Sequence, residues 1–203
     1  MARRKAEDRR VRRTRALLQD ALMGLMIEKG YEVITVQEII DRANVGRATF
    51  YAHFADKRTL LASRLEDLRE SLLARQREAL SAADRTGNGI TFSRAMLEHA
   101  AERLPLWKAL AGAESGAFVL KRLHEMLADL ARNDLSAMGM TRQSAQREMV
   151  TQHITGALMA VMTWWLDSGA KLSIDELDDS FRRVVMNGLA AFGLQQVRSR
   201  HTR

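Results

Sequence analysis

The stretch that decides the fold is TVQEIIDRANVGRATFYAHFADKRTLL, residues 35–61. Thr35 and Glu38 have the spacing of a capping box, which predicts that a helix begins directly after Thr35. Gly46 precedes a second short helical run, and Asp56 precedes a third and longer one. Two short helices joined by a tight turn, and preceded by a longer helix, form a helix-turn-helix unit. The stretch therefore predicts such a unit.

The segment before this stretch has the pattern of an amphipathic helix. Its apolar side chains recur every three or four residues, and the pattern stops at Gly30, a residue type that commonly follows a helix C-terminus. These side chains are Leu18, Leu22, Leu25 and Met26. We therefore predict a first helix from about Arg12 to Lys29, preceded by a flexible basic arm over residues 1–11.

The arm and the residues next to it carry most of the net charge of +7. Eight Lys and Arg residues oppose two acidic residues among the first fifteen, which leaves +6 in this segment. A basic segment of this kind displaces counterions from phosphates, so it is typical of a nucleic-acid contact. A solvated terminus without a partner is the alternative interpretation.

Composition favours an all-α fold. The chain has one proline and 12 glycines, with 46% hydrophobic residues, and it has no cysteine, which excludes disulfides and cysteine metal sites. Residues 149–166 lack Asp, Glu, Lys and Arg, but Thr151, Gln152 and His153 make a buried helix the better interpretation than a membrane span. We expect a cytoplasmic protein with no membrane partner.

The rest of the chain has the pattern of several further helices. The sequence DRTGNGIT, residues 84–91, is the clearest loop, and Ser173 and Glu176 repeat the capping-box spacing. Helices are predicted over residues 57–81, 92–103, 105–112, 114–138, 142–167 and 174–196. The predicted layout is a helix-turn-helix domain over residues 12–56 and a C-terminal helical domain over residues 57–203, with 57–81 as the connecting helix.

Motifs of enzyme chemistry are missing from the sequence. It has no H-E-x-x-H, no G-x-S-x-G and no glycine-rich phosphate loop, and His99, His124 and His153 are far apart along the chain. We therefore expect no catalytic site, no cofactor and no metal.

Residues 16–61, ALLQDALMGLMIEKGYEVITVQEIIDRANVGRATFYAHFADKRTLL, resemble the DNA-binding domain of the TetR family of transcriptional regulators. The motifs that carry the resemblance are KGY, TV..I and A.V…TFY.HF..K..L. More loosely, HAAERLPLWKALAG and WWLDSG resemble the ligand-binding half of that family. The resemblance implies a helical C-terminal domain for ligand binding and dimerisation.

The resemblance also implies roles for individual residues in DNA binding. It places Arg47, Ala48 and Ala52 toward base edges, where an arginine can donate two hydrogen bonds to guanine and an alanine methyl can contact thymine. The positions that resemble phosphate contacts are Thr35, Thr49, Tyr51, His53 and Lys57. The alternative is that Tyr51 and His53 are packing residues with polar tips. Where the family most often has Ser or Thr before the recognition helix, this chain has Gly46, which carries no hydroxyl.

Two sets of residues in the C-terminal half are candidates for a dimer interface and a ligand cavity. Small residues on one helix and an apolar stripe on the last helix predict a four-helix dimer interface, with an intrachain core as the alternative. The interface candidates are Gly156, Ala157, Ala160, Phe181, Val184, Val185, Gly188, Leu189 and Phe192. Methionines and aromatics predict a cavity for a small apolar or aromatic effector, although such residues also make solid cores. The cavity candidates are Phe92, Met96, His99, Trp107, Phe118, Met126, Met159, Met162 and Trp165, and His153 is a further polar candidate.

These features together predict a transcriptional regulator that binds a palindromic double-stranded DNA operator as a homodimer and acts as a ligand-responsive repressor. The alternative is a helical small-molecule-binding or enzyme-like protein whose basic arm contacts nucleic acid nonspecifically. A third reading is an architectural DNA-binding protein that has no ligand.

Overall fold

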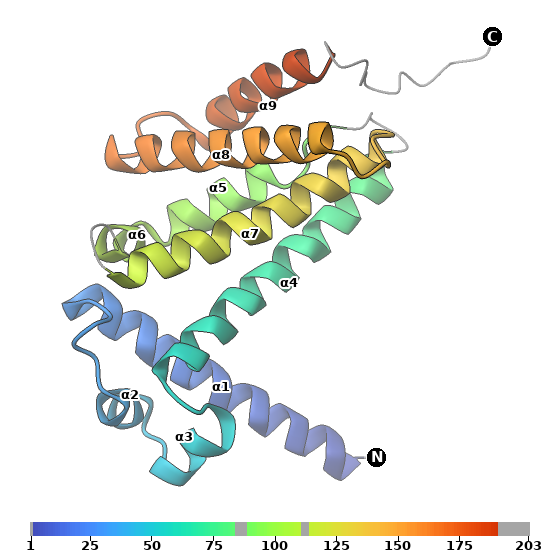
Figure 1. The fold of residues 1–203 in the computed structure, drawn as a ribbon. Coiled ribbons are helices and arrows are strands. Elements are labelled where there is room, and N and C mark those ends of the chain that lie inside the picture. Colours follow the sequence, from blue (N-terminus) through green and yellow to red (C-terminus); the bar gives the residue numbers. More distant parts are fainter. Residues whose placement is uncertain (1, 84–88, 111–113, 191–203) are drawn as a thin grey trace. The chain divides into compact units, whose positions relative to one another are not determined.

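A computed structural model describes residues 2–83, 89–110 and 114–190 (Figure 1). All regular structure in these residues is helical, and the all-α fold is confirmed. The helices are α1 (Ala2–Lys29), α2 (Val36–Ala43), α3 (Arg47–His53), α4 (Lys57–Ala83), α5 (Ser93–Glu102), α6 (Leu104–Leu110), α7 (Glu114–Ala137), α8 (Ala145–Asp167) and α9 (Ile174–Ala190).

The first helix is longer than the sequence pattern predicted. It begins at Ala2, so residues 2–11 continue α1, and the predicted start near Arg12 is wrong. The prediction relied on apolar periodicity, which is missing from this basic segment. Its residues are nonetheless mostly Ala, Arg, Lys and Glu, all good helix formers, with neither glycine nor proline among them.

The caps that bound α2, α3 and α4 lie where the sequence placed them. Thr35 accepts a hydrogen bond from the backbone N–H of Glu38, and the Glu38 carboxylate accepts one from the backbone N–H of Thr35, which confirms the capping box. Gly46 precedes α3 without a side-chain hydrogen bond. Asp56 accepts a hydrogen bond of 2.6 Å from the backbone N–H of Thr59, which satisfies a free donor in the first turn of α4.

The core of the helix-turn-helix unit is built from side chains of α1 to α4. Leu18, Leu22 and Met26 of α1 are buried, as predicted. The other buried side chains of this core include Ile39, Phe50, Phe54 and Leu60, whereas Val45 is only half-buried. α1 and α2 pack together, and the contact with α3 completes the unit. Burial of these apolar side chains fixes how α3 is presented.

One glycine allows α1 and α2 to be linked by an ion pair. A Cβ built on Gly24 of α1 would lie 2.6 Å from a guanidinium nitrogen of Arg42 on α2. In the space that Gly24 leaves, Arg42 reaches Glu28 and donates to both of its carboxylate oxygens at 2.7 Å. Both contacts come from one guanidinium nitrogen, Nη1, so the pair lacks the two parallel N–H···O bonds of a bidentate arginine–carboxylate pair.

The chain divides into two compact units. The first comprises Met1–Leu68 with Pro105–Val119, and the second comprises Arg69–Leu104 with Leu120–Arg203. Most of α6 and the beginning of α7 therefore belong to the unit that contains the helix-turn-helix, which sequence order did not indicate. The predicted domain boundary between residues 56 and 57 stays a prediction.

In the second unit, α5 packs against both α8 and α9. α8 begins at Ala145, three residues later than predicted, because Ser144 caps it by accepting a hydrogen bond from the backbone N–H of Arg147. Ser173 and Glu176 form the expected reciprocal bonds at the start of α9. The predicted end of the last helix, after Ala190, lies outside the described residues.

A buried polar cluster joins three segments of the second unit. The Asp134 carboxylate on α7 accepts hydrogen bonds from the backbone N–H and hydroxyl of Thr91, each 2.8 Å long, and from the Gln76 amide of α4 at 2.9 Å. Burial raises the pKa of Asp134 to about 6, although these hydrogen bonds oppose the shift. Near the start of α5, Ser93 donates a hydrogen bond to the buried Asp178 of α9.

No helix among the described residues is long and apolar enough to cross a membrane. Within α8, which holds residues 149–166, Val150, Ile154 and Leu158 are buried in the protein itself. The segment is therefore a helix with one face buried in the protein and the other exposed.

Candidate nucleic-acid interface

The two faces of α3 differ in exposure. Phe50, on the inner face, has no exposed surface, whereas Tyr51, its neighbour on the outer face, is 47% exposed. Arg47, Ala48 and Ala52 are exposed as well. Their spacing of four residues places Arg47 beside Tyr51 and Ala48 beside Ala52 on the helix surface. The structure thus brings the candidate base-reading residues together on one outward face.

Arg47 has partners on both α2 and α3. Its guanidinium donates a long hydrogen bond of 3.4 Å to the side-chain oxygen of Gln37, and its central carbon lies 5.5 Å from the centre of the Tyr51 ring. Gln37 in turn donates a hydrogen bond of 2.8 Å to Asp41. Gln37 was not among the predicted site residues, because its position next to Arg47 depends on how α2 crosses α3 and no local motif signals it.

Thr35, a candidate phosphate contact, already uses its hydroxyl within the chain. The hydroxyl donates to the Glu38 carboxylate at 2.9 Å. Hydrogen bonding by Lys29, followed by that of Thr35, lowers the pKa of Glu38 to about 2, so this carboxylate is ionised at neutral pH. Thr35 is exposed, but its side chain caps α2.

The other candidate phosphate contacts divide into two groups. Thr49 and His53, which also belong to α3, are half-buried. Lys57 differs from the prediction: its ammonium donates to the backbone oxygens of Tyr31, Glu32 and Ile34. An ammonium has three N–H donors, and these contacts use all three.

Arginines of α1 extend the basic character of the first unit. Arg9, Arg10 and Arg13 are exposed, and Arg15 is half-buried with its guanidinium carbon 5.0 Å from the centre of the Phe54 ring. These arginines and the buried core residues of the unit belong to the same continuous helix, α1. Packing of the core therefore also fixes the direction in which the arginines extend.

The nine candidate cavity residues are shared between the two compact units. Trp107 and Phe118 belong to the first compact unit, and the other seven belong to the second. Five are buried, namely Phe92, Met96, Met126, Met162 and Trp165, and the other four, His99, Trp107, Phe118 and Met159, are half-buried. The indole N–H of Trp165 donates to the backbone oxygen of Leu172, so this group is already satisfied.

The candidate dimer residues also divide into two sets. Phe181, Val185 and Leu189 are buried within the chain, on the inner face of α9, which agrees with the alternative of an intrachain core. Gly156, Ala157, Ala160, Val184 and Gly188 keep exposed surface, and Phe192 lies outside the described residues. Helical spacing reveals an apolar face without showing what covers it, so the dimer interface stays a prediction.

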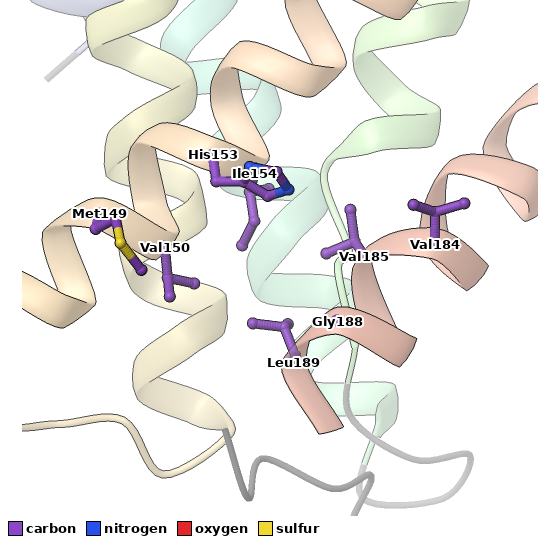
Figure 2. A pocket seen from close by; sticks show the side chains of 8 residues that line it. All are labelled: Met149, Val150, His153, Ile154, Val184, Val185, Gly188 and Leu189. Carbon is purple, nitrogen blue, oxygen red and sulfur yellow. The ribbon is translucent and has the colours of Figure 1, made fainter. Parts of the chain in front are cut away.

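A groove separates α8 and α9 on the surface of the second unit, and Figure 2 shows the side chains that line it. Its volume is about 250 Å³. Val150 and Ile154 of α8, with Val185 and Leu189 of α9, are the buried residues of its lining. The rest of the lining is exposed and consists of Met149, His153, Val184 and Gly188.

Comparison with known proteins agrees with this architecture. Residues 18–63 match the model of bacterial regulatory proteins of the tetR family, and residues 90–187 match a C-terminal region of transcriptional regulators. The chain belongs to the TetR family of bacterial transcriptional regulators. It is a DNA-binding regulator of a family that is generally non-enzymatic.

Individual relatives match the chain to different extents. The helix-turn-helix-type regulator YxbF of Bacillus subtilis (strain 168), itself uncharacterised, is 45% identical over 60 residues, which is 29% of this chain and only 16% of that protein. The crystal structure of a TetR transcriptional regulator from Streptococcus agalactiae has a TM-score of 0.61 at 24% identity, over 89% of this chain and 98% of that one. The structure of RolR in complex with resorcinol has a TM-score of 0.56 at 24% identity and covers 88% of each chain. At such identities the likeness shows the fold alone.

Proposed function

We propose that this protein is a ligand-responsive repressor that binds a palindromic DNA operator as a homodimer. The observation that carries the proposal is the outward face of α3, where Arg47, Ala48, Tyr51 and Ala52 are exposed together. In a helix-turn-helix protein this face of the recognition helix enters the major groove.

The residues of this face have complementary tasks in the proposed complex. Arg47 reads guanine through two hydrogen bonds, and the methyl groups of Ala48 and Ala52 contact thymine. Thr49, Tyr51 and His53 donate to phosphates, which sets the register of the protein on the duplex but adds little sequence preference.

An exposed apolar face on the second unit supports the proposed dimer. Met149, Trp164 and Val184 are 56%, 57% and 71% exposed, which is unusual for such side chains. Along α8, Met149 and Trp164 flank Gly156 and Ala160 at spacings of a helical face, so small residues lie between two large ones. A second copy of the chain would cover this face and the adjoining groove, and its two-fold symmetry would be matched by an inverted repeat in DNA.

The proposed effector is a small apolar or aromatic molecule bound by the second unit. Half-buried His99 and Met159 are the candidate cavity residues of this unit that retain accessible surface. RolR, whose fold this chain shares, has been crystallised with the aromatic ligand resorcinol. An effector that binds the DNA-incompetent arrangement tenfold more tightly would shift the balance by about 1.4 kcal/mol, enough to weaken repression.

Selection of bound duplexes from a random DNA pool tests this function. We expect enrichment of an inverted repeat whose half-site centres lie about 34 Å apart or further, since that distance is one turn of DNA. The matched control is the Arg47→Ala variant, which should enrich weaker sites with one position relaxed in each half. Recovery of no common sequence would favour the nonspecific binder instead, and a site without inverted symmetry would contradict the dimeric mode.

A further inference from the structure

The ammonium of Lys57 is surrounded by acceptors from a single turn of the chain. Its Nζ lies 3.0 Å from the backbone oxygens of Tyr31 and Glu32 and 2.8 Å from that of Ile34. It also lies 4.5 Å from the centre of the Tyr31 ring. The three carbonyls take the three N–H donors, and the ring face adds a favourable cation–π contact.

The three carbonyls belong to the turn that joins α1 to α2. α1 ends at Lys29, Gly30 takes a positive φ of 78°, and Thr35 then caps α2. Carbonyls in such a turn lie outside the hydrogen-bond ladders of the two helices, although that of Tyr31 also accepts a hydrogen bond of 3.2 Å from the Ile34 N–H. Lys57, the first residue of α4, supplies three donors to these carbonyls from 23 to 26 positions further along the chain.

We propose that Lys57 is a positioning residue rather than a phosphate contact. Its ammonium fixes the turn before α2 against the start of α4 and thereby determines how α2 and α3 are placed. This inference rests on the proposed DNA-binding function. To reach a phosphate, the ammonium would have to leave three carbonyls and a ring in a half-buried place. Its contribution to DNA affinity then comes through the placement of α2 and α3, not through its charge.

Two substitutions separate the two roles. Lys57→Met keeps most of the aliphatic stem and removes all three donors. Lys57→Arg keeps the charge, but a planar guanidinium does not place three donors around one nitrogen as an ammonium does. A phosphate contact would therefore survive largely in Lys57→Arg. The clamp, meaning the three hydrogen bonds by which Lys57 holds the turn, would be lost in both variants.

The first measurement needs no DNA. Hydrogen exchange of the backbone amides in residues 30–36 reports on the turn, including the Ile34 N–H, which donates to the Tyr31 oxygen at 3.2 Å. We expect exchange at least about tenfold faster in both variants, since tenfold corresponds to a modest loss of local stability. Amides of α8 serve as the folding control and should exchange at the wild-type rate. Unchanged exchange in the turn would overturn the proposal.

The second measurement is the salt dependence of binding to the selected operator. Loss of a phosphate contact lowers the slope of log K against log salt by about 0.9 for each contact. The proposal predicts instead that both variants bind about tenfold or more weakly at every salt concentration, with the wild-type slope. Lys171→Met, a charge removal on the exposed surface of the second unit, is the matched control and should leave binding unchanged.

The outcomes distinguish the clamp from the proposed function. A lower slope in Lys57→Met together with near-wild-type binding by Lys57→Arg would assign Lys57 to a phosphate and refute the clamp. Failure of the wild-type protein to bind any duplex would refute the DNA-binding function, while the exchange data would still decide whether Lys57 holds the turn.

Discussion

The guanidinium of Arg58 lies over the ring of Phe118, with its central carbon 4.9 Å from the ring centre. Arg58 belongs to the first turn of α4, directly after the helix-turn-helix, and Phe118 belongs to α7. Both residues lie in the first compact unit, although 60 positions separate them along the chain. This contact ties the beginning of α7 to the element that follows the recognition helix.

A double-mutant cycle measures the strength of this contact. We expect Arg58→Ala and Phe118→Leu to couple by about 0.5–1 kcal/mol in the free energy of unfolding, the range for a cation–π pair near the surface. Urea denaturation of the wild type, both single variants and the double variant gives the coupling. Lys171→Ala combined with Phe118→Leu is the control and should be additive. Additive effects in the Arg58 cycle would mean that the contact contributes nothing to stability.

Arg47 should determine which base the protein prefers at one position of each half-site. Arg47→Ala is expected to relax one base position in each half-site and to cost on the order of 1–3 kcal/mol on the selected operator, with a much smaller loss on random DNA. Gln37→Ala should produce a weaker form of the same change, because Gln37 only holds the guanidinium. Competition binding against single-base variants of the site measures both effects. Equal losses on specific and random DNA would remove Arg47 from base reading.

Deletion of residues 2–10 should weaken DNA binding without unfolding the protein. The deletion removes the N-terminal turns of α1, whereas Leu18 is the first buried residue in the part of that helix whose side chains are described, residues 9–29. We expect the salt slope to fall by about 0.9 for each phosphate contact that is lost. Binding titrations at several salt concentrations, with thermal unfolding as the control for folding, test this expectation. An unchanged slope would show that the segment is only solvated.

Gly46 offers a test by gain of function. Its φ of −75° suits any residue, and a Cβ there would meet the Thr49 hydroxyl oxygen at 3.7 Å, an ordinary contact. Gly46→Ser should stabilise the protein by a few tenths of a kcal/mol, since serine caps a helix slightly better than glycine. Its hydroxyl should also raise DNA affinity, by up to about tenfold if it reaches a phosphate. Gly46→Ala, which adds the Cβ alone, is the control and should instead lower stability. If Gly46→Ala raised DNA affinity as much as Gly46→Ser does, the serine hydroxyl could not be the cause of the gain.

Asp134 should make the stability depend on pH. Its pKa is raised from 3.8 to about 6 in the folded protein, so between these values the folded state binds more protons than the unfolded state. This group therefore lowers the free energy of unfolding as pH rises from about 4 to 6, by roughly 3 kcal/mol in total, and adds no further change above that. The stability of Asp134→Asn relative to wild type should rise by this amount across the window, as measured by urea denaturation. Asp129→Asn is the control on an exposed carboxylate, and a constant difference for Asp134→Asn would contradict the raised pKa.

Sequence alone was enough to locate the helix-turn-helix and its caps. The Thr35–Glu38 and Ser173–Glu176 boxes and the Asp56 cap depend on hydrogen bonds between residues three apart, so the local pattern determines them. The buried apolar side chains of α1 were visible for a similar reason, because helical spacing is a property of neighbouring residues. The extension of α1 to Ala2 was not predicted, because the residues of this segment favour a helix by propensity but lack the apolar periodicity on which the prediction relied.

Tertiary structure decided which partners the functional side chains have. The resemblance to the TetR family implied a phosphate contact for Lys57, but packing of the α1–α2 turn beside α4 gives its ammonium three carbonyls from residues more than twenty positions away. Gln37 meets Arg47 only because α2 and α3 cross, and Phe181 faces inward only because α9 packs against α5. Local hydrogen bonds and periodicity are short-range and can be read from neighbouring residues, whereas these contacts arise from how whole helices bury their apolar faces against one another.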